Sequence, residues 1–511
     1  MLATLGQLRP ALVSTALSEK LVGAKIGDAR LIREGEDEQE AFTLIDTFDN
    51  QIGAADMALI ATEDALLLIG PDAAVTRQDV AAPDFVDQMP EGPVTGKLSK
   101  IVDPLRRLLV RAEGVFSCQI LKMVDDLEKT VARCRVQSFA PENGSAACMI
   151  EFMPLRGYDE EMEQLTAYVA SLGKPLGTVG DIARALRGPG ADYTSKPVIA
   201  MTPEETSFQA ATDIIRAQIA VARANEPGVI EDIDSEFLHD YRVALRRTRS
   251  VVSLFKGVFT DQQTQQFKDR FGSLMARTGE LRDLDVHLLD RQPYRELVPP
   301  ALQPGIDKLF DSLAADRGAA HAKLARFFNG QAYLREMDKL EKLFAAPKRI
   351  AKGPEAERPA LAFAQALIWK RYVKVCKIAG SIDDTTPDEQ VHDLRIHCKK
   401  LRYLIEFFAP LFGKEDTKVM LKSLKKLQDN LGAFNDYSVQ QEALAGILDG
   451  LSDGDSTDAI EIATSIGALV TVLHQKQIEE RARVVASFVA FNSDKTRARF
   501  RKSFKPGKTA A

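Results

Sequence analysis

The spacing of apolar residues changes once along this chain. Up to about residue 186, short apolar runs alternate with polar turns, a pattern that predicts β-strands mixed with a few helices. From about Glu204 to Ala490, apolar residues recur every three or four positions, which predicts helices with few strands. The fold class is therefore expected to be α+β and multidomain, with a mixed α/β domain before an all-α region. Strands are expected at Ala41–Phe48, Ala58–Ala61, Ala65–Ile69, Thr130–Phe139 and Ala146–Met153, and helices of the first region around Leu98–Val115 and Asp159–Leu172.

Glycine and proline residues mark the expected boundaries. A segment that begins at Gly188-Pro189-Gly190 and continues through Pro197 and Pro203 predicts a linker. Breaks within the helical region predict about eight helices. These breaks fall near 226–228, 298–305, 330, 347–360, 381–387 and 449–454. The expected organisation is a first domain at 1–187, a linker at 188–203, a first helical repeat at 204–330, a connector at 331–356, a second helical repeat at 357–502 and a basic tail at 503–511.

The helical region contains an internal duplication. The segments that begin at His239 and at His392 share the pattern H-D-x-R-x-x-x-[RK]-[RK]-x-R, at an offset of 153 residues. The same offset carries Phe255 onto Phe408. One register that holds over roughly 80 residues is hard to obtain by chance, so we infer that one helical module is present twice.

Each copy of the motif places four basic residues along one edge of a predicted helix. At about 100° per residue, positions i, i+3, i+7 and i+10 fall within an arc of about 80°. No acidic residue occupies these positions, and like charges at such spacing destabilise a helix by a few tenths of a kcal/mol per pair. Two uncompensated rows favour an external anion over an ordinary solvated helix face. These rows, here called the cationic stripes, are His239, Arg242, Arg246 and Arg249, and His392, Arg395, Lys399 and Arg402. The opposite, apolar sides hold Leu238, Tyr241, Leu245, Val252 and Phe255, and Val391, Leu394, Leu401, Ile405 and Phe408.

The residue types of the stripes suit phosphate. Arginine offers a planar fork of donors, lysine a compact charge, and histidine a donor that gains charge near an anion. A row of such groups along a helix fits a linear chain of phosphates better than one small ligand. Further candidates, for which surface solubility is an equal alternative, are Arg282, Lys422, Lys425 and Lys426. His321 and His474 also match in register, but they lack a basic row and are expected to be core or surface residues.

Composition narrows the choice of partner and compartment. The net charge of −6 divides into −10 for residues 1–200 and +4 for residues 201–511, which is too little positive charge for a nonspecific nucleic-acid binder. The five cysteines form no C-x-x-C pair, which favours a reducing compartment over disulfides or a zinc site. Neither a long apolar run nor a secretory leader is evident, so a cytoplasmic location without membrane contact is expected. No cofactor and no metal are expected.

The doubled motif resembles the CHAD family, the conserved-histidine α-helical domains, over about residues 205–500. The resemblance implies two four-helix bundles related by a pseudo-twofold axis, with basic helices that line a central channel. It also implies that the partner is inorganic polyphosphate and that the protein associates with polyphosphate granules. Within the motif, Arg247 and Lys400 lie off the stripes, at a channel flank or facing water. The residues that the resemblance assigns to polyphosphate are His239, Arg242, Arg246, Arg247, Arg249, His392, Arg395, Lys399, Lys400 and Arg402.

The N-terminal region resembles the CYTH domain, the triphosphate-tunnel fold that often precedes a CHAD domain. Leu44-Ile-Asp-Thr-Phe-Asp49 is similar to that fold's Tyr-Phe-Asp-Thr turn, and the segment from Glu151 to Tyr158 is similar to its later acidic strand. However, no E-x-E-x-K strand precedes Leu44, and the next strands read ALIAT and ALLLI where the family places alternating arginines. A tunnel enzyme needs carboxylates for a divalent ion and cations for triphosphate. A degenerate, non-catalytic scaffold is therefore expected.

The residues leave three alternatives open. Histidine–aspartate pairs at His239 and His392 are compatible with a metal-dependent tri- or polyphosphate hydrolase, although a divalent cation beside three or four Arg or Lys side chains is unfavourable. A nucleic-acid or nucleotide-binding module would use the same stripes, but the aromatic residues of these helices lie on the apolar side, where bases could not stack on them. A purely structural helical scaffold would leave the stripes without a ligand.

Overall fold

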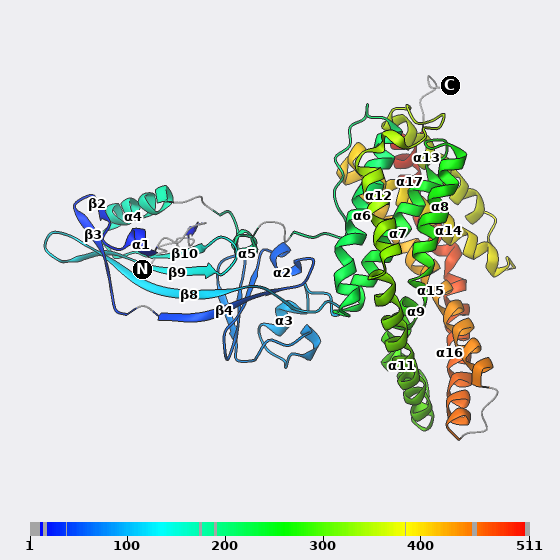
Figure 1. The fold of residues 1–511 in the computed structure, drawn as a ribbon, viewed down its shortest axis with the longest axis horizontal. Coiled ribbons are helices and arrows are strands. Elements are labelled where there is room, and N and C mark those ends of the chain that lie inside the picture. Colours follow the sequence, from blue (N-terminus) through cyan, green and yellow to red (C-terminus); the bar gives the residue numbers. More distant parts are fainter. Residues whose placement is uncertain are drawn as a thin grey trace. The chain divides into compact units, whose positions relative to one another are not determined.

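The computed structural model describes residues 11–13, 18–36, 38–172, 176–188, 192–383, 385–451 and 457–505. The chain divides into two compact units, Met1–Ser195 and Lys196–Ala511 (Figure 1). Residues 189–191 of the predicted linker, 452–456 of the last predicted break and 506–511 of the predicted tail lie outside the described residues. The chain is an α+β multidomain protein, with an antiparallel sheet domain followed by a helical region, as its apolar pattern predicts.

An antiparallel sheet forms the first unit. Its strands follow the order β1-β10-β9-β8-β4-β5-β6-β7, and β3 pairs with β8 and with β2. The strands are β1 (Ala11–Val13), β2 (Lys25–Ile26), β3 (Ala29–Arg33), β4 (Glu38–Asp46), β5 (Ala58–Ala61), β6 (Leu66–Ile69), β7 (Val75–Gln78), β8 (Leu109–Val124), β9 (Thr130–Pro141) and β10 (Ala147–Met153). The short helices α1 (Ser18–Leu21), α2 (Gln51–Ala54) and α3 (Thr95–Leu98) lie between strands, and α4 (Asp159–Leu172) and α5 (Val179–Arg187) follow the last strand.

The helix predicted at Leu98–Val115 is wrong. The α3 helix ends at Leu98, and the β8 strand runs from Leu109 with β4 on one side and β9 on the other. Pairing on both edges supplies hydrogen bonds along the strand that outweigh a weak helical periodicity. Gly114 marks the strand, because a Cβ atom there would lie 2.1 Å from the backbone oxygen of Ala140.

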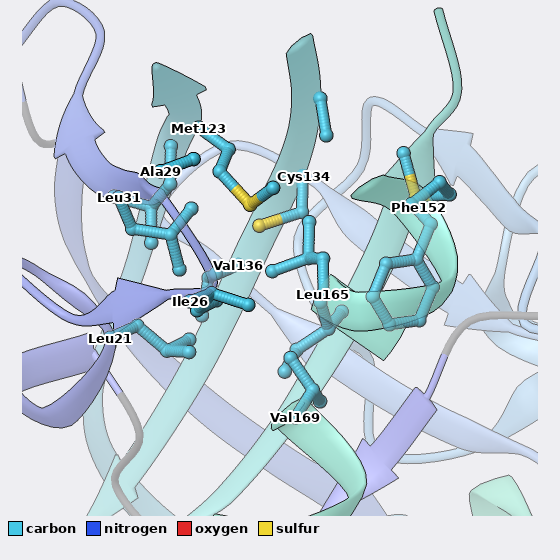
Figure 2. Close-up of a cluster of buried hydrophobic side chains, with 14 of the residues drawn as sticks. Leu21, Ile26, Ala29, Leu31, Met123, Cys134, Val136, Phe152, Leu165 and Val169 are labelled. Atoms are coloured by element: carbon cyan, nitrogen blue, oxygen red, sulfur yellow. The ribbon is translucent and has the colours of Figure 1, made fainter. Parts of the chain in front are cut away.

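Helices α4 and α5 bury parts of the sheet. Leu165 and Val169 of α4 pack in a cluster with Cys134 and Val136 of β9, as Figure 2 shows. Ile182 of α5 belongs to a second cluster on strands β4, β5, β9 and β10. Burial of these apolar side chains, at about 25 cal/mol per Å² of apolar surface, stabilises the domain.

Helices form the second unit. Among the described residues these are α6 (Ser207–Ile230), α7 (Ser235–Leu254), α8 (Asp261–Ala276), α9 (Gly279–Leu289), α10 (Arg291–Leu297), α11 (Gln303–Phe328), α12 (Gln331–Ala345), α13 (Ala360–Ala379), α14 (Asp388–Phe407), α15 (Lys414–Leu451), α16 (Thr457–Phe491) and α17 (Asp494–Phe504). The prediction of about eight helices therefore undercounts them. The α12 helix lies within the segment predicted as a connector and packs on α6. No helix in the described part of the chain is long and apolar enough to cross a membrane.

The break predicted at 226–228 is also wrong. Pro227 lies inside the last turn of α6, which ends at Ile230. A proline this close to the C-terminus of a helix removes one backbone hydrogen bond without interrupting several turns. Gly228 allows the tight turn into α7, because a Cβ atom there would lie 2.1 Å from the ring of Phe237. The chain turns at Asp232, which has a positive φ of 54°.

The duplication extends to the helices themselves. Shifted by 153 residues, the bounds of α7 become those of α14, and the start of α8 becomes the start of α15. The single helix α15 occupies the place that α8 and α9 share in the first copy. We refer to the two halves as the first and second copies.

A pseudo-twofold axis relates the two copies. The N–H of Ser207 donates to the carbonyl of Arg358 at 2.8 Å, and the N–H of Ala360 donates to the carbonyl of Glu205 at 2.8 Å. These bonds exchange under the offset, since each residue of one bond is equivalent to a residue of the other. Equivalent residues that bond reciprocally are the signature of a twofold interface. The equivalent rings of Phe255 and Phe408 also stack on each other, 4.9 Å apart.

Candidate functional site

Helix α7 is fixed at its start and along its buried side. The carboxylate of Asp234 accepts hydrogen bonds from the N–H groups of Glu236 at 2.9 Å and Phe237 at 3.2 Å, which caps the helix. All of the apolar residues predicted to lie opposite the stripes, in α7 and in α14, are buried. This confirms the predicted rotation of both helices and turns the stripes away from the core of each copy.

Partner side chains hold the first stripe. Arg282 of α9 donates to Nδ1 of His239 at 2.9 Å, so this ring carries its proton on Nε2 when neutral. Arg242 donates to the hydroxyl of Thr278 at 2.8 Å, and that hydroxyl donates to the carbonyl of Met275. Burial and the charge of Arg246 lower the pKa of Arg242. The structure therefore brings Arg282 to the stripe and places a fifth cation there.

The second stripe has a different set of partners. Nδ1 of His392 lies 2.7 Å from the amide oxygen of Asn435 on α15, so this nitrogen is the donor. Arg395 donates to Asp436 at 3.4 Å, and burial lowers the pKa of the Arg395 guanidinium. Arg402 forms an ion pair with Glu406 at 2.6 Å.

The two stripes meet at the pseudo-twofold axis. Helices α7 and α14 pack against each other, and they lie side by side in Figure 1. Arg246 and Lys399 are equivalent residues, and Arg246 lies close enough to act on the lysine. Desolvation, together with the charges of Arg395 and Arg246, lowers the pKa of Lys399. A twofold axis necessarily brings equal charges together, and here it brings a positive charge of each copy to one place.

Carboxylates neutralise part of the second stripe. The prediction of rows without compensation is therefore wrong for this copy, since Asp436 and Glu406 pair with its arginines. Glu406 also accepts a hydrogen bond at 2.8 Å from Arg247 of the other copy. In the described part of the chain, by contrast, Arg242, Arg246, Arg249 and Lys399 form no ion pair within 4.0 Å. The meeting place therefore keeps a positive excess.

Two motif residues off the stripes have separate surroundings. Arg247 crosses to the second copy, where its guanidinium lies over the ring of Phe407 at 5.0 Å. Lys400 lies on the other side of α14, in a groove that it shares with Arg371 and Lys374. Of the two, Arg247 belongs to the junction of the copies and Lys400 does not.

Other candidates lie apart from the stripes. Lys422, Lys425 and Lys426 are exposed on α15, and none of the described contacts joins them to the stripe residues. His321 donates from Nε2 to, or is bridged through, the turn after α6, 2.9 Å from the carbonyl of Val229. His474 is exposed on α16.

Sequence reasoning missed the residues that orient the stripes. Thr278 and Asn435 carry no charge and gave no signal in the motif. Glu406 was detectable, because it follows Arg402 by four residues on the same helix, a spacing at which opposite charges pair. Among the described residues, no group of three or more His, Cys, Asp or Glu side chains is placed to hold a metal ion.

The first unit offers a small cavity of a different character. Phe42, Ile60, Phe116 and Phe139 line it together with Glu40, and most of its other lining residues are also apolar. Nearby polar groups serve the fold: the carboxylate of Asp46, for example, accepts from the N–H groups of residues at the start of α2. Burial raises the pKa of Asp46 in spite of those bonds.

The fold and the facing stripes define a duplicated helical domain with a cationic junction. A family model described as the CHAD domain matches residues 213–445, and this part of the chain is a CHAD domain, as its sequence motif predicts. Two solved structures are similar to the chain. The CHAD domain from the plant Ricinus communis is 24% identical, with 58% of this chain and 96% of that chain covered at a TM-score of 0.49. PptA from Streptomyces chartreusis is 15% identical, with 56% and 99% covered at a TM-score of 0.43. Among curated proteins, none matches this chain.

Proposed function

We propose that this protein binds inorganic polyphosphate at the junction of the two copies of its CHAD domain. The observation that carries the proposal is the approach of Arg246 to Lys399 at the pseudo-twofold axis, where the lysine's pKa is lowered. Two like charges that face each other raise the free energy of the empty site. An anion between them reverses the sign of that interaction and restores the charged form of the lysine.

The extent of the stripes favours a chain of phosphates over one small anion. Arg242, Arg246 and Arg249 span seven residues of α7, a rise of about 10 Å at 1.5 Å per residue. Arg395, Lys399 and Arg402 repeat this spacing on α14. A linear polyanion can contact both rows at once, with forked donors from the arginines and a point charge from the lysine.

The histidines give the site a second type of donor. When Nδ1 of His239 accepts from Arg282, its Nε2 carries a proton in the neutral ring and can donate to a phosphate oxygen. Binding of polyphosphate would bring negative charge to His239 and His392 and so favour their charged forms. Affinity is therefore expected to rise as pH falls through the histidine range.

The first unit supports binding without hydrolysis. Its cavity has one carboxylate, Glu40, among mostly apolar residues, whereas a triphosphate-tunnel enzyme needs several carboxylates and cations in its tunnel. We therefore propose a degenerate CYTH-like scaffold that carries a polyphosphate-binding domain, and association with polyphosphate granules follows from that affinity.

A titration of the full chain with long-chain polyphosphate tests this function. The variant with Arg246→Glu and Lys399→Glu should bind at least about 100-fold more weakly at low salt, because each contact to a charged phosphate contributes about 1.5 to 3 kcal/mol. The matched control is Lys339→Glu with Lys342→Glu, two exposed lysines of α12. Affinity equal to that of the control would place the site elsewhere.

Two further arms separate the alternatives. Single- and double-stranded nucleic acids should compete with polyphosphate only weakly, whereas a nucleic-acid module would prefer them. Incubation of triphosphate and polyphosphate with Mg²⁺ or Mn²⁺ should release no phosphate above background. Sustained turnover that a chelator abolishes would show an enzyme instead.

A further inference from the structure

A second groove with basic walls lies on the side of α14 that faces away from the junction. Its volume is about 1340 Å³, and α13, α14 and the end of α7 form its walls. The cations that line it are Lys256, Lys370, Arg371, Lys374, Lys377 and Lys400. Within the described residues, none of these six forms an ion pair within 4.0 Å. A groove of this size with unpaired positive charges is a candidate anion site.

Negative charge near the groove is scarce. Glu355 also lines the groove, and it is held by Arg358 at 3.0 Å. Asp393 of α14 lies 4.0 Å from Nε2 of His397 and acts on Lys400. These two carboxylates leave a positive excess, because Arg358 already compensates one of them.

Buried groups fix one of the cations. Arg371 donates to Nδ1 of His397, a ring that is only 6% exposed. Because a guanidinium can only donate, Nδ1 must accept, and the histidine is held in its neutral form. Burial, together with the charges of Arg371 and Lys374, lowers the pKa of His397 to about 4. The neutral ring therefore orients Arg371 and adds no charge of its own at neutral pH.

The floor of the groove is apolar. Phe363, Leu367 and Leu404 lie among its lining residues. On α13, Lys370 and Lys377 are seven residues apart, a rise of about 10 Å. A short chain of phosphates can bridge these lysines, and an attached apolar or aromatic group can lie on the floor.

The groove belongs to the second copy alone. At the offset of 153 residues, the α13 cations Lys370, Arg371, Lys374 and Lys377 correspond in α6 to Ala217, Gln218, Val221 and Ala224. The duplicated stripes preserve their charges in both copies, whereas these four positions differ completely. Basic residues that appear in only one copy are not required by the packing that both copies share.

We propose that this groove is a separate binding site for oligophosphates, either free or as the phosphate chain of a nucleotide. It takes the ligand with Lys370, Lys374 and Lys377 of α13 on one side and Lys400 of α14 on the other, and Arg371 adds a fixed fork of donors. The site is independent of the polyphosphate site, from which the body of α14 separates it.

The test uses the full chain with Arg246→Glu and Lys399→Glu already present, so that the junction is silenced. Calorimetry at low salt with inorganic triphosphate should still show one binding event. Adding Lys374→Glu and Lys377→Glu should weaken it at least about tenfold. The matched control adds Lys339→Glu and Lys342→Glu, two exposed lysines with the same spacing on α12, and should leave binding unchanged.

Parallel titrations with ATP and adenosine identify the source of the phosphate. Affinity for triphosphate equal to that for ATP assigns free oligophosphate, and tighter binding of ATP assigns a nucleotide whose base lies on the apolar floor. As a second readout, triphosphate should shift the ring NMR signals of His397 and leave those of exposed His474 in place. The proposal is overturned if the silenced chain binds no triphosphate, or if Lys374→Glu with Lys377→Glu binds it as well as the control. Because the junction is absent from every arm, failure here does not bear on polyphosphate binding.

Discussion

The two copies of the helical module hold their stripes in different electrostatic surroundings. Arg282, the partner of His239, is a cation, whereas the equivalent residue of the second copy, Asn435, is neutral. Glu406 neutralises arginines in the second copy, and its equivalent in the first copy is Ser253. Duplication has thus preserved the row of basic residues and changed what surrounds it. The first copy is the more positive half of the site.

This difference teaches which side of the junction contributes more binding energy. A cation with a carboxylate partner must share its charge between partner and ligand, and the ligand gains less. Arg242 has a neutral partner in Thr278, and its lowered pKa indicates an unsatisfied charge. Arg395 and Arg402 already have carboxylates. We expect the stripe of α7 to dominate affinity and that of α14 to complete the channel.

The largest expected effect comes from reversing charges in the first copy. Arg242→Glu with Arg246→Glu should weaken polyphosphate binding by about 100-fold or more, because it removes two cations without carboxylate partners. The matched change in the second copy, Arg395→Glu with Arg402→Glu, should cost about tenfold. Titration of both variants at one salt concentration measures the ratio. Equal losses would remove the asymmetry between the copies.

Removing the shared carboxylate should have the opposite sign. Glu406→Gln keeps the shape of the side chain and releases Arg247 and Arg402 from their ion pairs. Affinity for polyphosphate should rise about threefold to tenfold, with a steeper dependence on salt. Glu389→Gln, an exposed change on the same helix, is the control and should have no effect. Weaker binding by Glu406→Gln would show that Glu406 serves mainly to position its arginines.

Lys399 offers a test in which stability and binding move apart. Its lowered pKa means that the folded chain disfavours the charged form, so Lys399→Gln should stabilise the unliganded protein. The gain should be a few tenths of a kcal/mol, because the side chain is exposed and solvent screens its charge. The same change should weaken polyphosphate binding. Thermal unfolding with and without polyphosphate measures both effects, and a loss of stability in the unliganded protein would contradict the repulsion.

The smallest expected effect concerns His397 and acidic pH. Its pKa of about 4 lies below the value of about 6.5 for an unfolded chain, so below pH 6.5 the unfolded state binds a proton that the folded state does not. Stability from this residue is present above pH 6.5 and is lost as pH falls toward 4. The groups that face the ring are Arg371 and Lys374 of α13 and Asp393 and Lys400 of α14.

The loss should be at most about 2 kcal/mol between pH 7 and pH 4.5, after allowance for solvent screening. Denaturant unfolding of the wild type and of His397→Gln at both values measures it. The variant should lose less stability on acidification than the wild type, while His474→Gln should behave as the wild type. Parallel pH profiles for all three proteins would show that His397 titrates normally.

The sequence was most informative where a strong pattern repeats. The doubled motif predicted the CHAD domain, and the apolar residues opposite the stripes are buried as expected. The pairing of Arg395 with Asp436 depends on how α14 packs against α15, and a single helix pattern does not contain that information. The strand β8 was mistaken for a helix because its structure depends on partners distant in sequence, β4 and β9.

The reciprocal bonds of Ser207 and Ala360 show why the junction could not be predicted in detail. A repeat in sequence implies similar copies, but it does not say which face of one copy meets the other. Arg246 and Lys399 come together because the axis passes beside them, a property of the packed helices. The groove beside Lys400 escaped notice for the same reason, since its lysines lie on two helices that the motif does not link.

A double-mutant cycle on Arg246 and Lys399 tests the central claim most directly. Arg246→Gln, Lys399→Gln and the double variant are titrated with polyphosphate of one defined length at one salt concentration, and the free energies of binding are compared. If both residues contact the same polyanion at the axis, the losses should not be additive, with a coupling of about 0.5 kcal/mol or more. Losses that add within about 0.3 kcal/mol, or variants that bind as the wild type does, would contradict a shared site between the two copies.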